Sequence, residues 1–471
     1  MKKTIRRGFI FMLLLLSTSV IACGTPEIDE NTKDPTLETP SEVPSETPEE
    51  TPFPLLDKWT EVDCFSFSYK QLGKNVMPIG AWCAPTGDYN TNEQYKLVKE
   101  AGLNSVYGLY ENYSLNSPEV MKALDYAANN DIVYLVRDSG MVSHTEETDD
   151  FKEYIKKYTT HKAYGGTLLI DEPGVKQIDN YLLARKLFRS YLPKDAFYFN
   201  LLPNYANKGQ LENGAGGGEN TMNLTYEQYV RAFLEKLQPQ FFSYDYYGTN
   251  KDFPNVSKGY LDQLYVNSKL AHEYKIPLWP FIQACEYGGS TRVPNEIDIY
   301  WQVNVSLAYG AKGIQYFCYF QPPEFSSVGY EGSFINKEGK PTDIYYAGQK
   351  INKQIARMDH ILMNSTLMCQ MVFGDSPCTI NQDNLVTSYR EIKSITTEDD
   401  LLIGCFDYGG KSVYYLVNNN LTENCEATID FTSLVRANLF YMTEDKLVEG
   451  DTINVSLKPG EGVLLELTNY K

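Results

Sequence analysis

Two adjacent acidic residues follow an apolar run in the first half of the chain. Residues 165–170 lead directly into Asp171, Glu172 and Pro173, and this pattern predicts a buried strand that ends where proline removes a ladder hydrogen bond. Two carboxyl groups at the edge of an apolar core raise each other's pKa. A carboxyl group that keeps its proton near neutral pH can act as a general acid. The alternative is a structural acid pair that caps the next helix.

Three further strand-like runs end in polar side chains. Asp138 follows one run, Asp245 ends a second between two tyrosines, and Gln283 ends a third, with Glu286 three residues beyond it. A second carboxylate facing the first would complete a pair able to cleave an acetal bond. Asp245 and Glu286 are both candidates for that role. Their structural alternatives are a carboxylate that binds neighbouring loops and a solvated loop acid.

Eight strand-like runs alternate with amphipathic helical runs, and the polar residues above sit at strand ends. Strands favour the β-branched and aromatic residues that fill these runs, whereas 92–101, 118–128, 226–237, 297–309 and 345–358 have helical spacing. The predicted strands are 77–84, 105–110, 132–137, 166–171, 197–202, 241–246, 278–283 and 313–320.

This repeat predicts a closed (β/α)₈ barrel, the TIM barrel, over residues 61–376. The alternative, a doubly wound open sheet, lacks support because no GxGxxG follows a predicted strand; the glycine-rich run 214–218 lies in a polar stretch. In a TIM barrel the active site lies at the C-terminal ends of the strands. After residue 377, short runs separated by Gly, Asn and Asp turns predict a small all-β sandwich domain that extends to residue 471.

The Asp171-Glu172-Pro173 segment resembles the Asn-Glu-Pro motif of the large superfamily of retaining barrel glycoside hydrolases. The resemblance implies that Glu172 is the acid/base and that a nucleophile lies at the end of the seventh strand, where Glu286 is the candidate. Asp171 replaces the family's asparagine, which binds the sugar 2-hydroxyl, and an ionised Asp171 could accept but not donate that bond. Segments 307–317 and 457–465 also resemble the eighth strand and the final sandwich strand of such proteins.

Three functions remain open at this stage. The first is a glycoside hydrolase, either retaining with Glu286 or inverting with Asp245 as the base. The second is a carbohydrate-binding surface lipoprotein without catalysis, which Gln283 favours because an amide cannot act as a nucleophile. The third and weakest is a solute-capture lipoprotein, because such proteins have two lobes rather than eight repeats.

Aromatic residues make up 13% of the chain and include 37 tyrosines, which suggests flat faces for sugar rings as well as core packing. No metal or organic cofactor is expected, since glycosidic cleavage needs only paired carboxylates and the cysteines have no zinc-site spacing. The predicted substrate-binding residues are Asp171, Trp82, Asp138, Asn200, Tyr244, Tyr246, Trp279, Gln283, Tyr316 and Tyr319.

The N-terminus predicts export and lipid attachment. Four basic residues precede the apolar run 8–21, a pattern typical of a signal peptide over residues 1–22. The segment Val20-Ile21-Ala22-Cys23 resembles the bacterial lipobox, which implies that Cys23 is diacylated and anchors an extracytoplasmic protein to the membrane. Residues 23–60, rich in Pro, Thr and Glu, predict a disordered tether. A net charge of −19 argues against binding nucleic acid.

Overall fold

The computed structural model describes residues 65–108, 118–137, 146–192, 194–287, 289–321, 331–375 and 386–468. The expected signal peptide, Cys23, the tether and Asp138 lie outside these residues. None of the helices among the described residues is long and apolar enough to cross a membrane.

Eight parallel strands close into a barrel, which confirms the expected fold class. Each strand pairs with the next, and the eighth pairs with the first. The strands are β1 (Ile79–Trp82), β2 (Ser105–Tyr107), β3 (Val133–Arg137), β4 (Tyr164–Asp171), β5 (Ala196–Leu201), β6 (Phe242–Tyr244), β7 (Leu278–Gln283) and β8 (Ile314–Phe317).

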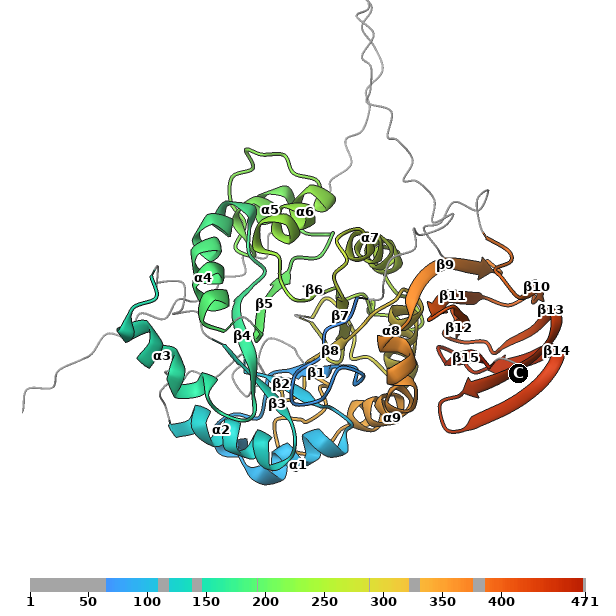
Figure 1. Ribbon diagram of the computed structural model, residues 1–471, viewed down its shortest axis with the longest axis horizontal. Helices are drawn as coiled ribbons and strands as arrows, with labels where there is room; N and C mark the ends of the chain where they lie inside the picture. The colour runs from blue at the N-terminus through green and yellow to red at the C-terminus, as the bar shows by residue number, and fades with distance from the viewer. Residues whose placement is uncertain are drawn as a thin grey trace, which may run out of the picture. The chain divides into compact units, whose positions relative to one another are not determined.

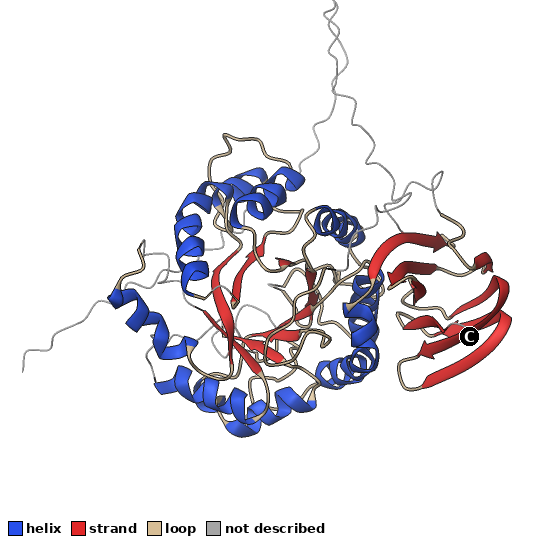
Figure 2. Ribbon diagram, viewed as in Figure 1, coloured by secondary structure: helices blue, strands red, loops and turns tan. Residues whose placement is uncertain are grey.

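Helices lie around the outside of the barrel (Figures 1 and 2). Several begin at a side chain that accepts a hydrogen bond from the first turn: the Asn295 side chain accepts from the Asp298 amide at 3.0 Å, and the Asp298 carboxylate accepts from the Asn295 amide at 2.8 Å. This reciprocal capping satisfies donors that a helix leaves unpaired. The helices are α1 (Asn92–Glu100), α2 (Pro118–Asn129), α3 (Asp149–Thr159), α4 (Ile178–Tyr191), α5 (Lys208–Asn213), α6 (Tyr226–Leu237), α7 (Gly259–Glu273), α8 (Glu296–Ala308) and α9 (Asp343–Met363).

The barrel interior is filled by large aromatic side chains. Tyr107, Tyr198 and Phe281 belong to one buried cluster with the two barrel tryptophans. Gly313 has no side chain for a steric reason: a Cβ atom there would lie 2.6 Å from the ring of Trp279. The interior is therefore a packed core rather than a channel, as in other barrels of this size.

An antiparallel sheet of seven strands follows the barrel, as expected for an all-β domain. Its apolar residues form a core of their own. The first strand lies before the expected boundary at 377, because residues after α9 turn straight into the sheet. The strands are β9 (Thr366–Phe373), β10 (Ile392–Thr396), β11 (Leu401–Tyr408), β12 (Lys411–Asn418), β13 (Cys425–Phe440), β14 (Asp445–Leu457) and β15 (Gly462–Thr468).

Buried hydrogen bonds join this sheet to the barrel helix α8. The side chain of Asn304 donates to the Gly460 carbonyl at 2.8 Å and accepts from the Tyr415 hydroxyl at 2.8 Å. Trp301 donates its indole N–H to Asn419 at 2.7 Å. These contacts agree with a packing role for the C-terminal domain.

Candidate active site

Three carboxyl groups meet at the C-terminal end of the barrel. Asp171 is the last residue of β4, Glu172 follows it, and Asp245 follows β6. Parallel strands in a barrel place these ends on the same face. Asp171 is exposed, Glu172 is partly buried and Asp245 is only 4% exposed. The cluster is therefore open to solvent on one side and enclosed by protein on the other.

The backbone at Glu172 explains how two consecutive side chains reach one cluster. In a regular strand they would point to opposite faces. Glu172 instead has a φ of +49°, in the left-handed region, so the alternation stops there. Its amide still donates to the Asn200 carbonyl on β5 at 2.9 Å, which keeps the turn attached to the sheet. Strained backbone of this kind concentrates at functional sites.

The protonation states of the three acids differ because their surroundings differ. Burial, then the charges of Asp245 and Asp171, raise the pKa of Glu172 well above its usual value. The pKa of Asp245 is also raised, by burial and by the charge of Asp171, but the Asn200 amide opposes the shift. Desolvation by the surrounding protein raises the pKa of Asp171 to about 6. The hydrogen bond from Asn200 and the charge of Arg137 oppose this rise. Near neutral pH Asp171 is thus ionised, whereas Glu172 and Asp245, whose pKa reaches about 8, hold a proton between them.

Asn200 lies between the two aspartates, at the end of β5. Its amide donates to Asp171 Oδ1 at 3.2 Å, and its own oxygen accepts from Ser243 at 2.8 Å. The structure therefore places this predicted substrate-binding residue against the acids. Asp245 Oδ1 is buried and has no hydrogen-bond partner among the residues that the structure describes. A buried acceptor left without a donor is costly unless a ligand or water supplies one.

Four side chains near the acids were missed by sequence reasoning. Tyr205, in the loop after β5, is 54% exposed, and its hydroxyl has a raised pKa through desolvation and the charge of Asp245. Tyr247 and Tyr287 stack at 4.7 Å, and Arg137 ends β3. Arg137 and Tyr247 could have been found, since one ends a strand and the other is two residues from Asp245. Tyr205 and Tyr287 lie in loops without such a signal.

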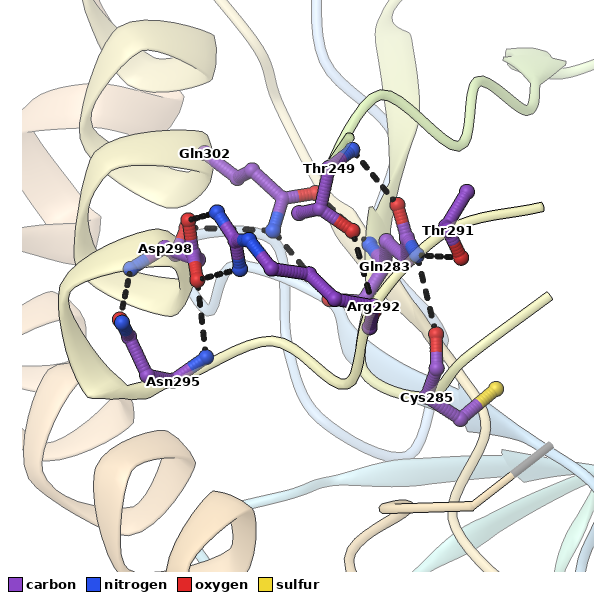
Figure 3. A network of polar contacts seen from close by, with 8 residues as sticks. All are labelled: Thr249, Gln283, Cys285, Thr291, Arg292, Asn295, Asp298 and Gln302. Carbon is purple, nitrogen blue, oxygen red and sulfur yellow. Dashed lines mark hydrogen bonds and ion pairs between the residues drawn. The ribbon is translucent and has the colours of Figure 1, made fainter. Parts of the chain in front are cut away.

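Gln283, at the end of β7, is used by the protein itself (Figure 3). Its Oε1 accepts from the Thr249 amide at 3.1 Å, and its Nε2 donates to the Cys285 carbonyl at 3.0 Å and to the Thr291 hydroxyl at 2.9 Å. The side chain is fully buried. Both amide hydrogens are occupied, so Gln283 has no donor left for the substrate it was expected to bind.

The same network continues from the loop after β7 into α8 (Figure 3). Arg292 forms a two-pronged ion pair with the buried Asp298, with the longer contact at 2.7 Å. Gln302 accepts from the Gln283 amide at 2.9 Å and donates to the Gln283 carbonyl at 3.2 Å. These hydrogen bonds and this ion pair hold the end of β7 in place.

Glu286 lies apart from this network, in the loop beyond Gln283. Its side chain is partly buried, and its backbone amide donates to the Glu331 carbonyl at 2.8 Å. The charges that raise the pKa of Glu172 are those of Asp245 and Asp171. The structure thus brings Asp245 to Glu172.

The two tryptophans expected as sugar platforms are packed inside the barrel. Trp279 is stacked on Phe241 with ring centres 3.7 Å apart and has Gly313 on its other side. Trp82 donates its indole N–H to Gln315 at 3.2 Å. Both side chains are almost fully buried. Core packing, the alternative role, is the one observed, because interior-facing strand positions fill the barrel.

The four expected tyrosines are also buried. Tyr316 donates to Asn352 on α9 at 2.8 Å, and Tyr319 donates to the Gln94 carbonyl on α1 at 3.3 Å. Tyr244 and Tyr246 pack with the residues between the barrel and its helices. Strand alternation explains their outward direction: on β6 the neighbours Ser243 and Asp245 take the inward positions.

Two cavities lie away from the carboxyl cluster, and the described residues form no metal site. A cavity of about 470 Å³, lined among others by Gln240 and Pro277, lies before β6 and β7, at the opposite end of the barrel. A smaller one, of about 20 Å³, is lined by Phe65 and Lys312. Within the described residues, no group of His, Cys, Asp and Glu side chains could hold a metal ion.

Comparisons with known proteins give structural similarity only. No family model matches the sequence, and no curated protein matches it. A family 39 glycoside hydrolase from Bacteroides cellulosilyticus WH2 aligns over 85% of this chain and 82% of its own, at 11% identity and a TM-score of 0.47. An α-amylase from Geobacillus thermoleovorans aligns over 84% and 99%, at 10% identity and a TM-score of 0.47. Xylanase 10B from Thermotoga maritima aligns over 61% and 98%, at 11% and 0.39.

Proposed function

We propose that the protein is a glycoside hydrolase in which Glu172 is the general acid/base. The observation that carries the proposal is the cluster of Asp171, Glu172 and Asp245 at the barrel mouth, where Glu172 and Asp245 hold a proton between them beside the ionised Asp171. A protonated acid next to an ionised one is the arrangement that glycosidic cleavage requires. The substrate class is an extracellular oligo- or polysaccharide.

Asp245 is the second carboxylate in this proposal, in place of Glu286. Asp245 interacts directly with Glu172. A retaining pair stands about 5–5.5 Å apart and an inverting pair roughly 6.5–9.5 Å apart, so the shorter retaining spacing needs the smaller movement when a substrate enters between them. Glu172 protonates the glycosidic oxygen while Asp245 attacks the anomeric carbon, and water then hydrolyses the glycosyl ester with Glu172 accepting the proton.

The test is Glu172→Gln, which keeps the size of the side chain and removes the transferable proton. Activity on natural glycosides should fall by about 10²–10⁴ fold, the usual worth of general acid catalysis. Aryl glycosides with a good leaving group should lose much less, because their leaving oxygen needs little protonation. Glu286→Gln is the matched control and should retain activity. Unchanged hydrolysis by Glu172→Gln across a panel of sugars would exclude the proposal.

A second candidate is a carbohydrate-binding protein without catalysis. The buried Gln283 at the end of β7 favours it, because that strand end supplies no carboxylate. Binding of an oligosaccharide without any cleavage, by wild type and Glu172→Gln alike, would select this candidate.

We also propose that the protein is lipid-anchored through Cys23, on the strength of the lipobox-like segment before it. Cys23→Ala should release the protein from membranes or block its processing. Membrane fractionation and intact mass measure this, and unchanged values for both would contradict it.

The proline- and glutamate-rich segment 23–60 serves in this proposal as a tether. Limited proteolysis should cut there first and leave a stable fragment that begins near Leu55. Earlier cleavage within the barrel would contradict the assignment.

A further inference from the structure

A short chain of polar side chains crosses the otherwise aromatic interior of the barrel and ends at the acids. It runs from Gln315 on β8 through Ser243 on β6 to Asn200 on β5, and all three are buried. Buried polar groups of this kind are expensive unless each finds a partner. Their hydrogen bonds have a direction, which can be followed group by group.

The orientation of the Gln315 amide is determined by two groups that each hydrogen-bond in only one way. The indole N–H of Trp82 can only donate, and it faces Gln315 Oε1 at 3.2 Å. The carbonyl of Trp279 can only accept, and it faces Gln315 Nε2 at 3.2 Å. The second hydrogen of Nε2 therefore points to Ser243 Oγ, at 2.9 Å.

Ser243 passes this direction to Asn200. Because its hydroxyl accepts from Gln315, its single hydrogen has two acceptors within reach, Asn200 Oδ1 at 2.8 Å and the Tyr198 oxygen at 3.1 Å, and the nearer one is Asn200. Once that oxygen is occupied, the NH₂ group of Asn200 must face the other way. It donates to Asp171 at 3.2 Å and also interacts with Asp245.

We propose that Gln315, acting through Ser243, is a positioning residue that holds the Asn200 amide with its NH₂ group toward Asp171 and Asp245. An ionised carboxylate accepts such hydrogen bonds, so the Asn200 amide lowers the pKa of both aspartates against the effect of burial and has no such effect on Glu172. With the amide reversed, its oxygen would face the aspartates and favour their protonated forms. The catalytic meaning of this arrangement rests on the proposed function, but its existence does not.

Other titratable groups around the cluster do not account for this selection. The pKa values of Cys83, Tyr198, Tyr205 and Tyr247 are raised, so these groups are neutral near pH 7, whereas hydrogen bonds lower the pKa of Cys318, which lies behind Cys83. Arg137 acts on Asp171 from β3 and adds to the effect of Asn200 there. The groups in question are Arg137, Cys83, Tyr198, Tyr205 and Tyr247.

The experiment is an infrared pH titration of the whole folded protein without substrate. The protonated-carboxyl band that is lost in Glu172→Gln reports Glu172. In Ser243→Ala the midpoint of this band should fall by about one pH unit, because losing a hydrogen bond to a charged group shifts a pKa by that order. The protonated-carboxyl band that is lost in Asp245→Asn should move to a higher midpoint in Ser243→Ala, because Asp245 then loses the hydrogen bond that lowers its pKa.

Ser105→Ala is the matched control, since Ser105 is an equally buried serine of the barrel, on strand β2, outside this chain of hydrogen bonds. Its midpoint should equal that of wild type. Should Ser243→Ala not fold, Ser243→Cys keeps the size and a weak donor, and its midpoint should move in the same direction by less. An unmoved midpoint in the folded variant, or no band lost in Glu172→Gln, overturns the inference. Failure of the proposed function is seen separately, as intact hydrolysis by Glu172→Gln.

Discussion

The ends of β4 and β6 differ sharply from the end of β7, although all three lie on the same face of one barrel. At β4 and β6, three carboxyl groups lie together, Glu172 takes a left-handed backbone, and one buried oxygen of Asp245 has no partner among the described residues. At β7, Gln283 makes three hydrogen bonds from its side chain, and Arg292 pairs with Asp298.

This difference separates chemistry from scaffold. Most buried polar groups are satisfied by the protein, and strained backbone beside acids of raised pKa is typical of a place where another molecule binds or reacts. The end of β7 stabilises the loops that surround the site. The ends of β4 and β6 hold buried acidic groups close together, which costs folding free energy. The following predictions test whether these strand ends serve catalysis and the end of β7 serves stability.

The largest expected effect is on catalysis at Asp245. Asp245→Asn should lower the turnover of every glycoside substrate by at least about 10²–10⁴ fold, because it removes the nucleophile rather than the proton donor. Azide should restore part of the activity of Asp245→Ala by attacking in its place. If Asp245→Asn keeps nearly full activity and Glu286→Gln is inactive, the nucleophile is Glu286, in the loop after β7.

Removing the amide at β7 should cost stability rather than chemistry. Gln283→Ala leaves the Thr249 amide, the Cys285 carbonyl and the Thr291 hydroxyl short of a partner, and we expect a loss of about 2–4 kcal/mol in the free energy of unfolding. Urea denaturation measures it, with Glu286→Gln as the unaffected control. A variant as stable as wild type would show that these hydrogen bonds do not hold the loop.

Neutralising Glu172, after β4, should raise the free energy of unfolding rather than lower it. The folded pKa of Glu172 lies above its usual value of 4.5, so folding binds a proton, and the stability that this brings is lost as the pH rises from about 4.5 toward the folded pKa. Glu172→Gln should therefore exceed wild type in unfolding free energy by on the order of 1 kcal/mol at pH 7, with no gain near pH 4.

Asp171→Asn should show the same trend over a narrower range. Its pKa rises from 3.8 to about 6, so the gain should develop between these pH values and then level off. Because Asp171 is exposed, solvent screening makes this gain smaller than that of Glu172→Gln. Thermal melts against pH measure both variants, and a gain that grows toward low pH would contradict the raised pKa values.

The smallest effect is expected at Tyr205, the exposed aromatic residue beside the acids. Tyr205→Ala should raise KM by roughly two- to tenfold with little change in kcat, since an aromatic contact contributes about 0.5–1.5 kcal/mol. Tyr205→Phe keeps the ring and is the control. A fall in kcat instead would move Tyr205 from substrate binding to the chemistry.

Sequence patterns predicted the barrel because its elements are local. The run before Asp171 is a strand in any packing that buries it, and Asn295 caps α8 through residues three positions away. The expected domain boundary at 377 was less accurate, because β9 continues directly from α9 and its partner β11 is distant in the sequence. The roles of Trp82 on β1 and Trp279 on β7 were harder to predict. A tryptophan can stack on a sugar or fill a core, and only the structure shows that both are buried in the core.

By itself, the sequence determined that Asp171, Glu172 and Asp245 end parallel strands, because apolar periodicity and strand-ending residues are properties of short segments. Only the tertiary structure decided which carboxylate faces Glu172 and which residues merely support it. That choice depends on how loops after β6 and β7 bend, and on a hydrogen-bond direction that passes from Gln315 to Asn200 across three strands. Such distances and orientations join residues far apart in the chain, where no local pattern records them.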